Sequence, residues 1–385
     1  MGAYVCHPSR GSEPTVGWNR ALESARFGEV HVLTHDEGNR EAVERAVRDG
    51  ALEGVHFHWL DHTPLEERLM GLPGGYYAGY QRWQHRQYLW AREMHEREPF
   101  DLAHQVNLCG FRAPGELWRL EIPFVWGPVG GTQNTPSAFF QYGGAGMTLR
   151  EGVRGVLNGV QLRTSRRVRQ AVEAADAVLA ANSTGKRDLE AAFGVEVHQL
   201  LETGVRSVAP ARRWADRAPG PFRLLWAGEV VQRKGIRIAL EAVQAARARG
   251  LEVDLIVVGD GPALEDARAA GADVRGQIPR DRLLALYHDV DALAFTSLRD
   301  TSGNVMLEGL AAGLPVVYLD HQGAADMGSA ACGIPVPVTT PDQAVEGVAD
   351  GIEALVTEPG LYDRLSRGAT IRATGLRWSE FVASM

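Results

Sequence analysis

Short apolar runs alternate with longer amphipathic stretches along the chain. The short runs predict buried strands, and the stretches between them have helical periodicity, as in Trp18–Phe27 and Gln84–Arg97. In the first half of the chain the predicted strands are Ala3–Cys6, Val30–Thr34, Val55–Leu60, Leu102–Gln105, Phe124–Gly127, Ala177–Ala181 and Val197–Leu201.

The alternation stops at Arg212–Pro221, which is rich in Arg, Ala, Pro and Gly, and then restarts. Strands that alternate with helices indicate βαβ units and parallel sheets. Two such series predict an α/β protein of two doubly wound, Rossmann-like domains, with ligands outside the carboxyl ends of the strands and a site in the cleft between the domains. The predicted elements of the second series are strands 222–226, 253–258, 273–275, 292–296 and 315–319 and helices 236–249, 263–269, 280–288 and 304–312.

Composition narrows the class of protein. The 385 residues suffice for two or three domains, and 45% apolar and 23% charged residues exclude disordered, collagen-like and coiled-coil chains. No apolar stretch has the length of a membrane-spanning helix, and no signal peptide is read at the N-terminus, so a cytoplasmic protein is expected. A net charge of −8 argues against a nucleic-acid partner. The odd, scattered cysteines Cys6, Cys109 and Cys332 indicate neither a disulfide framework nor a zinc site.

The strongest chemical signal runs from Thr296 to Glu308. A buried strand ends at Thr296, a loop of small and polar residues follows, and a helix starts near Asn304. The unpaired N–H groups of a helix start attract phosphate without a metal. Asp300 and Glu308 would lie close to that point as acceptors for hydroxyl groups. The pattern suggests a ligand with both phosphates and sugars, although a turn-capping Asp300 and an ion-paired Glu308 explain the spacing equally well.

A second signal is a strand end followed by a glycine turn at Gly228 and a basic pair, Arg233-Lys234, before another helix. Such a pair could neutralise a diphosphate from the other side, unless it is only a solvated turn. Lysine is rare here, since Lys186 and Lys234 are the only lysines among 40 basic residues. A lysine retained in such a chain can mark a site that needs a compact ammonium group on a flexible stem, which a guanidinium does not replace.

Other segments carry weaker signals. Glycines in the loop Pro8–Trp18 and in Gly127–Gly131 allow close approach to a ligand, but each segment also reads as a plain turn. Asp289 and Asp291 precede a strand, which favours a turn over a metal-binding pair. No Cys/His spacing suggests zinc. The arginine-rich stretch 147–170 is read as a solvated helix face, with a membrane-docking or acceptor-facing helix as the alternative.

Taken together, these segments resemble the retaining family-four glycosyltransferases of the GT-B fold. The resemblance rests on Gly11–Asn19, on His31–Thr34 and Asp101–His104, on 118–120 and 122–131, and on the segments 224–235 and 300–308, the last with two acids separated by seven residues. Arg377-Trp378-Ser379 resembles a C-terminal helix that crosses back to the first domain. The resemblance implies domains at 1–208 and 209–365, with this crossing helix at 366–385.

The sequence also departs from the family. Asp300 stands where Glu is usual, and Glu229 stands where an arginine beside the diphosphate is usual, with Arg233 as its candidate replacement. The family's reactive histidine often lies two residues beyond His104, where this chain has Val106. The segment Asp320–Ala325 replaces a glycine-rich turn.

The resemblance implies transfer of a sugar from a nucleoside diphosphate sugar, with UDP expected rather than GDP, to a hydroxyl or amine of a sugar, lipid-linked or natural-product acceptor. Neither a cofactor nor a metal is expected. The implied catalytic residues are Lys234, Arg233, Asp300 and His104. The implied donor-binding residues are Glu308 at the ribose, Gln277 and Ile278 at the base, and also Gly228, Thr301, Ser302, Gly303, Asn304 and Val305. The implied acceptor or phosphate loops contain Gly11, Ser12, Gly17, Gly130 and Gly131.

Two alternatives stay open. A nucleotide-sugar 2-epimerase of the same architecture would need paired carboxylates and a histidine at the sugar, which the sequence does not locate. A non-catalytic nucleotide-sugar-binding module would follow if Glu229 and Asp300 had disabled transfer.

Overall fold

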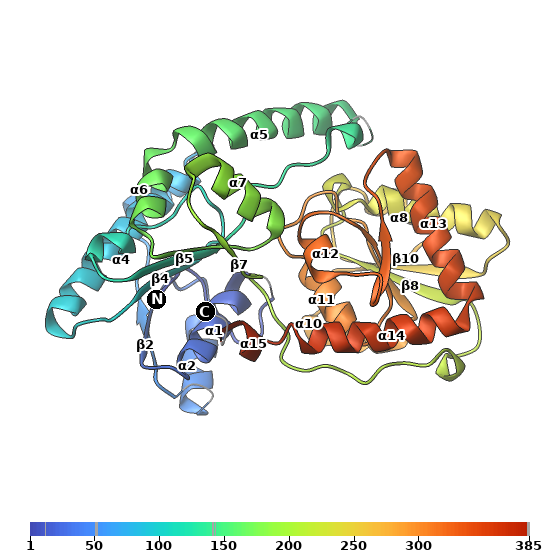
Figure 1. The fold of residues 1–385 in the computed structure, drawn as a ribbon, viewed down its shortest axis with the longest axis horizontal. Helices are drawn as coiled ribbons and strands as arrows, with labels where there is room; N and C mark the ends of the chain where they lie inside the picture. Colours follow the sequence, from blue (N-terminus) through green and yellow to red (C-terminus); the bar gives the residue numbers. More distant parts are fainter. Residues whose placement is uncertain (12, 51–52, 141, 143, 383–385) are drawn as a thin grey trace. The chain divides into compact units, whose positions relative to one another are not determined.

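The computed structural model describes residues 1–11, 13–50, 53–140, 142 and 144–382. The chain forms two compact units (Figure 1). The first unit consists of Met1–Thr132, Asn158–Thr203 and Phe381–Met385, and the second of Gln133–Leu157 and Gly204–Glu380.

These units differ from the predicted domains in two places. The segment Gln133–Leu157 belongs to the second unit, because its side chains bond there: Tyr142 donates to Glu241, and Glu151 pairs with Arg299. The chain beyond 365 also stays with the second unit up to Glu380, since one long helix continues through the expected boundary.

The first unit contains a seven-stranded sheet whose strand pairs are all parallel, in the order β3-β2-β1-β4-β5-β6-β7. The order reverses between β1 and β4. Its strands are β1 (Gly2–Ala3), β2 (Val30–Thr34), β3 (Val55–Trp59), β4 (Ala103–Asn107), β5 (Phe124–Val129), β6 (Ala177–Ala180) and β7 (His198–Gln199). Its helices are α1 (Glu13–Ser24), α2 (Arg40–Arg48), α3 (Pro64–Met70), α4 (Tyr76–Arg97), α6 (Arg166–Ala174) and α7 (Ser183–Phe193), and α5 (Gly144–Thr164) belongs partly to each unit.

The second unit contains a six-stranded parallel sheet in the order β10-β9-β8-β11-β12-β13, which reverses between β8 and β11. Its strands are β8 (Phe222–Ala227), β9 (Val253–Val258), β10 (Asp273–Gly276), β11 (Ala292–Phe295), β12 (Val316–Leu319) and β13 (Gly333–Val336). Its helices are α8 (Ile236–Ala248), α9 (Leu264–Ala269), α10 (Arg280–Asp289), α11 (Asn304–Ala311), α12 (Gln322–Met327), α13 (Pro341–Thr357), α14 (Pro359–Thr374) and α15 (Trp378–Val382).

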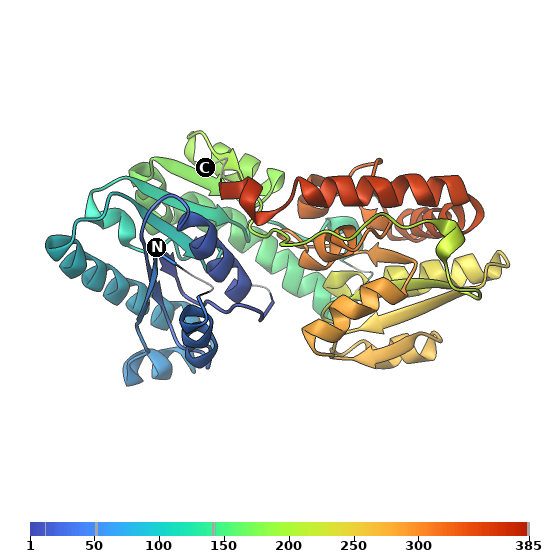
Figure 2. The same cartoon turned by 90° about the horizontal axis from the view of Figure 1, so that it is seen from below.

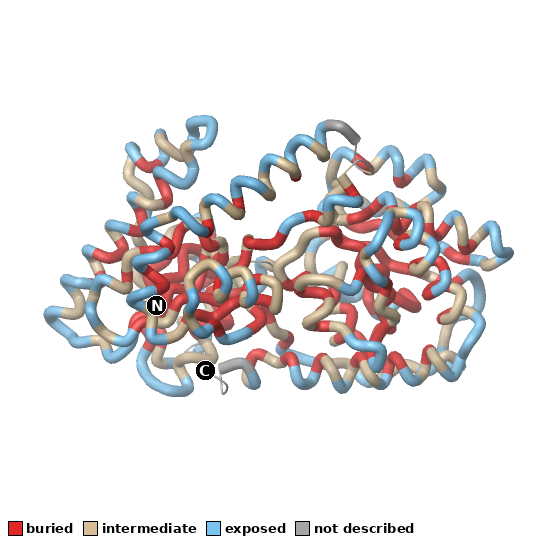
Figure 3. The backbone as a smooth tube through the Cα atoms, turned by 45° about the horizontal axis from the view of Figure 1, so that its top comes forward, coloured by how far each residue is buried: buried red, intermediate tan, exposed pale blue. Residues whose placement is uncertain are grey.

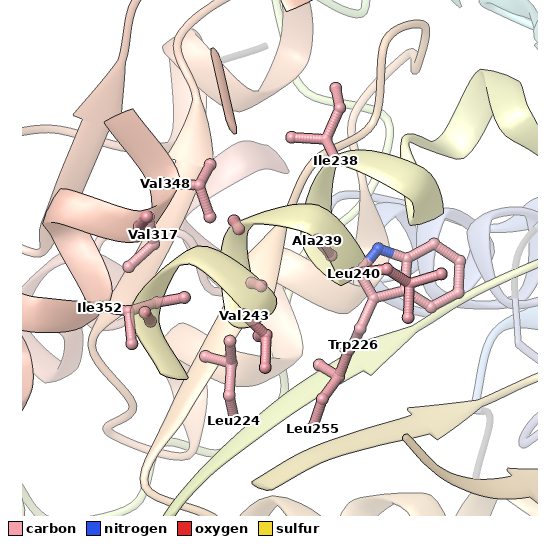
Figure 4. Packing of buried hydrophobic residues seen from close by; sticks show 14 of the residues in the cluster. Leu224, Trp226, Ile238, Ala239, Leu240, Val243, Leu255, Val317, Val348 and Ile352 are labelled. Carbon is pink, nitrogen blue, oxygen red and sulfur yellow. The ribbon is translucent and has the colours of Figure 1, made fainter. Parts of the chain in front are cut away.

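Buried residues gather on the strands and on the helix faces that cover them (Figure 3). In the second unit, apolar side chains of β8, α8 and α13 meet in one cluster, with Leu224, Val243 and Ile352 among them (Figure 4). Helix α14, the long red helix of Figure 2, lies on the same unit and contacts α11. The cluster fixes the sheet whose carboxyl edge carries the candidate site.

The predicted α/β class with two doubly wound sheets is confirmed. Strands β2 and β9 have the predicted bounds, whereas β1 covers Gly2–Ala3 instead of Ala3–Cys6. None of the described helices is long and apolar enough to cross a bilayer.

Candidate functional site

The point where the strand order of the second sheet reverses brings two distant segments together. Strands β8 and β11 are neighbours there, and ligands of open α/β sheets bind at such a reversal. Beyond the carboxyl end of β8 lies Lys234, and beyond that of β11 lies Asp300. The Lys234 Nζ donates to Asp300 Oδ2, and both side chains keep about a fifth of their surface exposed, 22% and 20%.

Backbone contacts fix the turn that carries Lys234. Gly235 has φ +69, and a Cβ there would lie 1.8 Å from the carbonyl oxygen of Thr296, so only glycine fits this position. The Thr296 hydroxyl donates to Gly235 O at 2.8 Å, and the Leu298 N–H donates to Arg233 O at 3.0 Å. The lysine and the Asp300 loop are therefore held as one assembly.

The Asp300 loop ends in helix α11. Its N-cap residue, Gly303, has no side chain to cap the first turn, so backbone N–H groups there stay available for an anion. Asp300 Oδ1 accepts from the N–H of Thr301 at 3.1 Å, which orients the carboxylate. Thr301, Asn304 and Val305 are half-buried, whereas Ser302 and Gly303 are buried.

Glu308 lies one turn into α11 with two partners from α10. Arg280 donates to its Oε1 at 2.6 Å, and the buried Tyr287 hydroxyl donates to its Oε2 at 3.1 Å. A carboxylate has about four acceptor positions, so capacity remains for hydroxyl donors. Gln277 and Ile278 connect β10 to α10, close in sequence to Arg280.

Arg233 is the candidate replacement for the arginine that the family usually has at the position of Glu229, and it is already paired. Arg233 Nη2 bonds to Glu229, so the two residues partly neutralise each other, and both side chains reach solvent. Asp291 has the predicted structural role directly before β11: it is buried, pairs with Arg217 at 2.9 Å and accepts from the Arg223 N–H at 2.7 Å. Asp289 lies at the end of α10 and not in a turn.

A half-buried arginine that the sequence analysis did not single out directly precedes Asp300 in the chain. Arg299 has a side chain only 13% exposed, and its Nη2 lies 3.3 Å from Oε1 of the buried Glu151. Thr135 donates to the other Glu151 oxygen at 2.7 Å. Burial, followed by the charge of Arg154, lowers the pKa of Arg299 to about 10, against the opposing charge of Glu151. Several arginines and one carboxylate therefore lie on this side of the loop.

The sequence analysis also did not predict the contacts of Gln322 and His321. Gln322, in the segment that departs from the family, accepts from the Asp300 N–H at 3.1 Å and donates to Asn134 O at 2.9 Å. His321 donates to Ser297 O at 2.9 Å, and burial lowers its pKa. The sequence had marked this segment only as a departure from the family that directly follows a predicted strand.

The first unit does not place His104 where an acceptor-side residue was expected. His104 is the second residue of β4, inside the sheet and not at its carboxyl edge, and its Nε2 donates to Gly127 O at 2.8 Å. Burial lowers its pKa to about 3. At the carboxyl edge of β4 lie instead Asn107 and Cys109, and the half-buried Glu13 accepts from the Cys109 N–H at 3.2 Å.

The predicted glycine loops have mixed outcomes. Gly17 lies inside α1 and not in a loop, where a Cβ would meet Val5 O at 2.5 Å, so its role is close packing of helix on strand. Gly11 precedes α1, and Ser12 lies outside the described residues. Gly130 and Gly131 follow β5, where the Gly130 N–H donates to Cys109 O at 2.7 Å.

Parts of this chain are similar in sequence to known proteins. Residues 221–358 match the family described as Glycosyl transferases group 1. Glycogen synthase of Mycobacterium tuberculosis is 27% identical over 215 residues, 53% of this chain and 51% of that protein. A D-inositol 3-phosphate glycosyltransferase of Pseudarthrobacter chlorophenolicus is 29% identical over 185 residues, 45% of this chain and 43% of that protein. The chain thus matches about half the length of these curated relatives.

Solved structures resemble the whole chain. Sucrose-phosphate synthase from Thermosynechococcus elongatus gives a TM-score of 0.66 with 17% identity, over 100% of this chain and 94% of that one. Anabaena Alr3699/HepE, solved with UDP and glucose, gives 0.62 with 15% identity, over 99% and 98%. The chain accordingly has the GT-B fold of two Rossmann-like units. Its residues 221–358 match the group 1 glycosyl transferases, which agrees with the resemblance drawn from the sequence for that part of the chain.

Proposed function

We propose that the chain is a glycosyltransferase that moves a sugar from a nucleoside diphosphate sugar to an acceptor hydroxyl or amine, with retention of configuration and without a metal. The observation that carries the proposal is the Lys234–Asp300 ion pair beside the start of α11, with Glu308 one turn further on. This arrangement offers a cation and helix N–H groups to phosphates and two carboxylates to sugar hydroxyls.

The proposed chemistry follows from these positions. Glu308 accepts hydrogen bonds from ribose hydroxyls, and Asp300 accepts them from the donor sugar. Lys234 and the α11 N–H groups stabilise the diphosphate as its bond to the anomeric carbon breaks. The acceptor oxygen attacks from the same face and gives its proton to the departing phosphate oxygen. Only interactions that strengthen as the leaving group gains charge raise the rate.

Relatives support the choice of substrates. The Anabaena protein is solved with UDP and glucose, which supports a UDP donor. The relatives named for D-inositol 3-phosphate and 2-deoxystreptamine transfer, the latter from Streptomyces kanamyceticus, support a small polyhydroxylated acceptor. The acceptor-side residues are proposed to lie at the carboxyl edge of the first sheet, where Gly11, Gly130 and Gly131 stand.

A panel of nucleotide sugars tests the proposal. The purified protein is incubated with each one, and released nucleotide and residual sugar are measured by chromatography. Slow donor cleavage that depends on Lys234 is the expected result. Conversion to the 2-epimer would instead establish an epimerase, and saturable binding without turnover would establish a binding module.

We also propose that Arg299, not Arg233, supplies the second cation near the diphosphate. Arg299→Gln is expected to lower kcat/KM for donor cleavage about tenfold, because its side chain is 13% exposed and a less exposed charge acts through a lower dielectric. Both arginines pair with a glutamate, so exposure separates them: Arg233→Gln, which removes a cation 31% exposed, is the matched control with a smaller loss. Arg299→Lys keeps the charge and the pairing with Glu151; an equal loss in all three variants would contradict the assignment.

Helix α5 supports a peripheral membrane partner. Leu149, Val153, Val156 and Val160 recur at helical spacing and are between 50% and 70% exposed, and arginines such as Arg150 lie on the same helix. Apolar residues flanked by arginines suit an anionic lipid surface. The double change Val156→Ser and Val160→Ser is expected to reduce cosedimentation with phosphatidylglycerol vesicles, whereas Leu102→Ser, at a comparably exposed residue, leaves it unchanged. Equal binding by all variants would contradict this partner.

A further inference from the structure

Three histidines gather on the paired strands β2 and β3 of the first unit, whereas the candidate site at Lys234 belongs to the second. The parallel pairing of the two strands sets His31 opposite His56 and Leu33 opposite His58. Residues at even spacing share one face of a strand, so His31, His56 and His58 lie on the same face of the sheet. Glu29 precedes β2 by one residue. These residues are far from Lys234 in sequence and belong to the first unit.

The ligand atoms of Glu29, His31 and His56 converge. One atom from each lies within 4.8 Å of the others, and His56 Nε2 is 3.9 Å from Glu29 Oε2. Zinc binds imidazole nitrogen and carboxylate oxygen at about 2.0–2.2 Å, so donors around one ion stand about 3.3–3.5 Å apart. Glu29 and His56 have side chains 72% and 50% exposed, which leaves them free to make the small rotation required.

His58 holds the ring of His31 in place. His31 Nδ1 and His58 Nε2 are hydrogen-bonded at 3.0 Å, with the two rings stacked at an interplanar angle of 3°. His58 in turn packs against Trp90 at 4.4 Å between ring centroids. When Nδ1 of His31 donates this bond, the lone pair stays on Nε2, the arrangement by which outer partners orient histidine ligands.

We propose that Glu29, His31 and His56 bind a divalent transition-metal ion, with Zn²⁺ as the best match, and that His58 positions His31. Two imidazoles and one carboxylate leave a fourth position for water or a further ligand. The ion would join strand β2 to the edge strand β3 and stabilise this side of the sheet. The site is separate from the proposed sugar transfer, which remains metal-independent.

The experiment uses the full-length protein with its affinity tag removed, stripped with a chelator and titrated with ZnCl2 by calorimetry. One ion per chain is expected, together with a higher Tm when zinc is present. Co²⁺ is the second probe, because its visible absorption reports four-coordinate binding by nitrogen and oxygen. MgCl2 serves as the negative control, since imidazole ligands do not suit that ion.

Matched variants decide the assignment. His56→Ala is expected to abolish stoichiometric binding and the Tm increase, and His58→Phe is expected to weaken affinity about tenfold by releasing His31. His85→Ala, at a similarly exposed histidine on α4, is expected to bind as the unaltered protein does. Both His56 and His85 are exposed, so neither change should prevent folding. Absence of saturable zinc binding, or equal loss in His56→Ala and His85→Ala, would overturn the proposal.

Discussion

Replacing Lys234 with alanine is expected to lower kcat for donor cleavage about 10²- to 10³-fold, the loss typical of removing one group that stabilises developing charge. The Lys234 ammonium lies at the reversal of the second sheet, bonded to Asp300 and beside the start of α11. Negative charge on the diphosphate grows as the glycosidic bond breaks, so the lysine contributes more to the transition state than to donor binding. Initial rates with the active nucleotide sugar and calorimetry with the nucleoside diphosphate measure the two effects.

Two controls accompany this change. Lys186→Ala removes the other lysine, which is exposed on α7 and pairs with Glu190 at 3.6 Å, and should leave kcat unchanged. Lys234→Arg keeps the positive charge but alters its shape and reach, so partial activity is expected. Equal losses of kcat and of nucleotide affinity in Lys234→Ala would rule out a transition-state role.

Glu308→Gln is expected to weaken binding of the nucleoside diphosphate by about 10- to 100-fold, because hydrogen bonds to a charged group are worth about 1.5–3 kcal/mol each. The amide keeps the shape of the carboxylate but loses its charge and one acceptor. Glutamine retains an oxygen for Arg280, which limits the disturbance to α10 that alanine would cause. Calorimetric titration with UDP measures the effect.

The matched variant for Glu308 is Tyr287→Phe. It removes only the hydroxyl that donates to Glu308 Oε2 at 3.1 Å and leaves the carboxylate charge. We expect a smaller loss of affinity, since Tyr287 only orients the acceptor. Unaltered UDP affinity in Glu308→Gln would refute the ribose assignment, whatever Tyr287→Phe does.

The fold was largely readable from the sequence because fully buried parallel strands are nearly continuous apolar runs. Val253–Val258 illustrates this, with matching predicted and observed bounds. The start of α1 was missed: the helix begins at Glu13 and not at Trp18. Pro14 and the small residues around it suggested a loop, yet proline is tolerated in the first turn of a helix.

The candidate site was predicted in part. Asp300, Glu308 and Lys234 could be chosen as candidates because strand-end loops of an α/β sheet have a recognisable composition and converge at one edge, and their roles stay predictions. The contact of Asp300 with Lys234 is seen only in the structure. So is the bonding of Arg233 to Glu229, where the sequence analysis offered Arg233 as the replacement for the arginine missing at Glu229. His104 was predicted on the acceptor side but lies inside the sheet, because a sequence motif gives a residue's position along a strand and not how deeply its side chain is buried.

The amino-acid sequence by itself determined the two α/β series, the family resemblance and the residue types that suit a nucleotide sugar, because each of these is encoded locally in patterns of apolar, glycine and acidic positions. Only the tertiary structure decided which side chains meet: Arg280 pairs with Glu308, Arg299 pairs with Glu151, and His31 lies beside His56 and Glu29. The physical reason is that electrostatic and coordination bonds depend on separations of a few ångströms between groups distant in the chain, and those separations are set by strand order, register and burial.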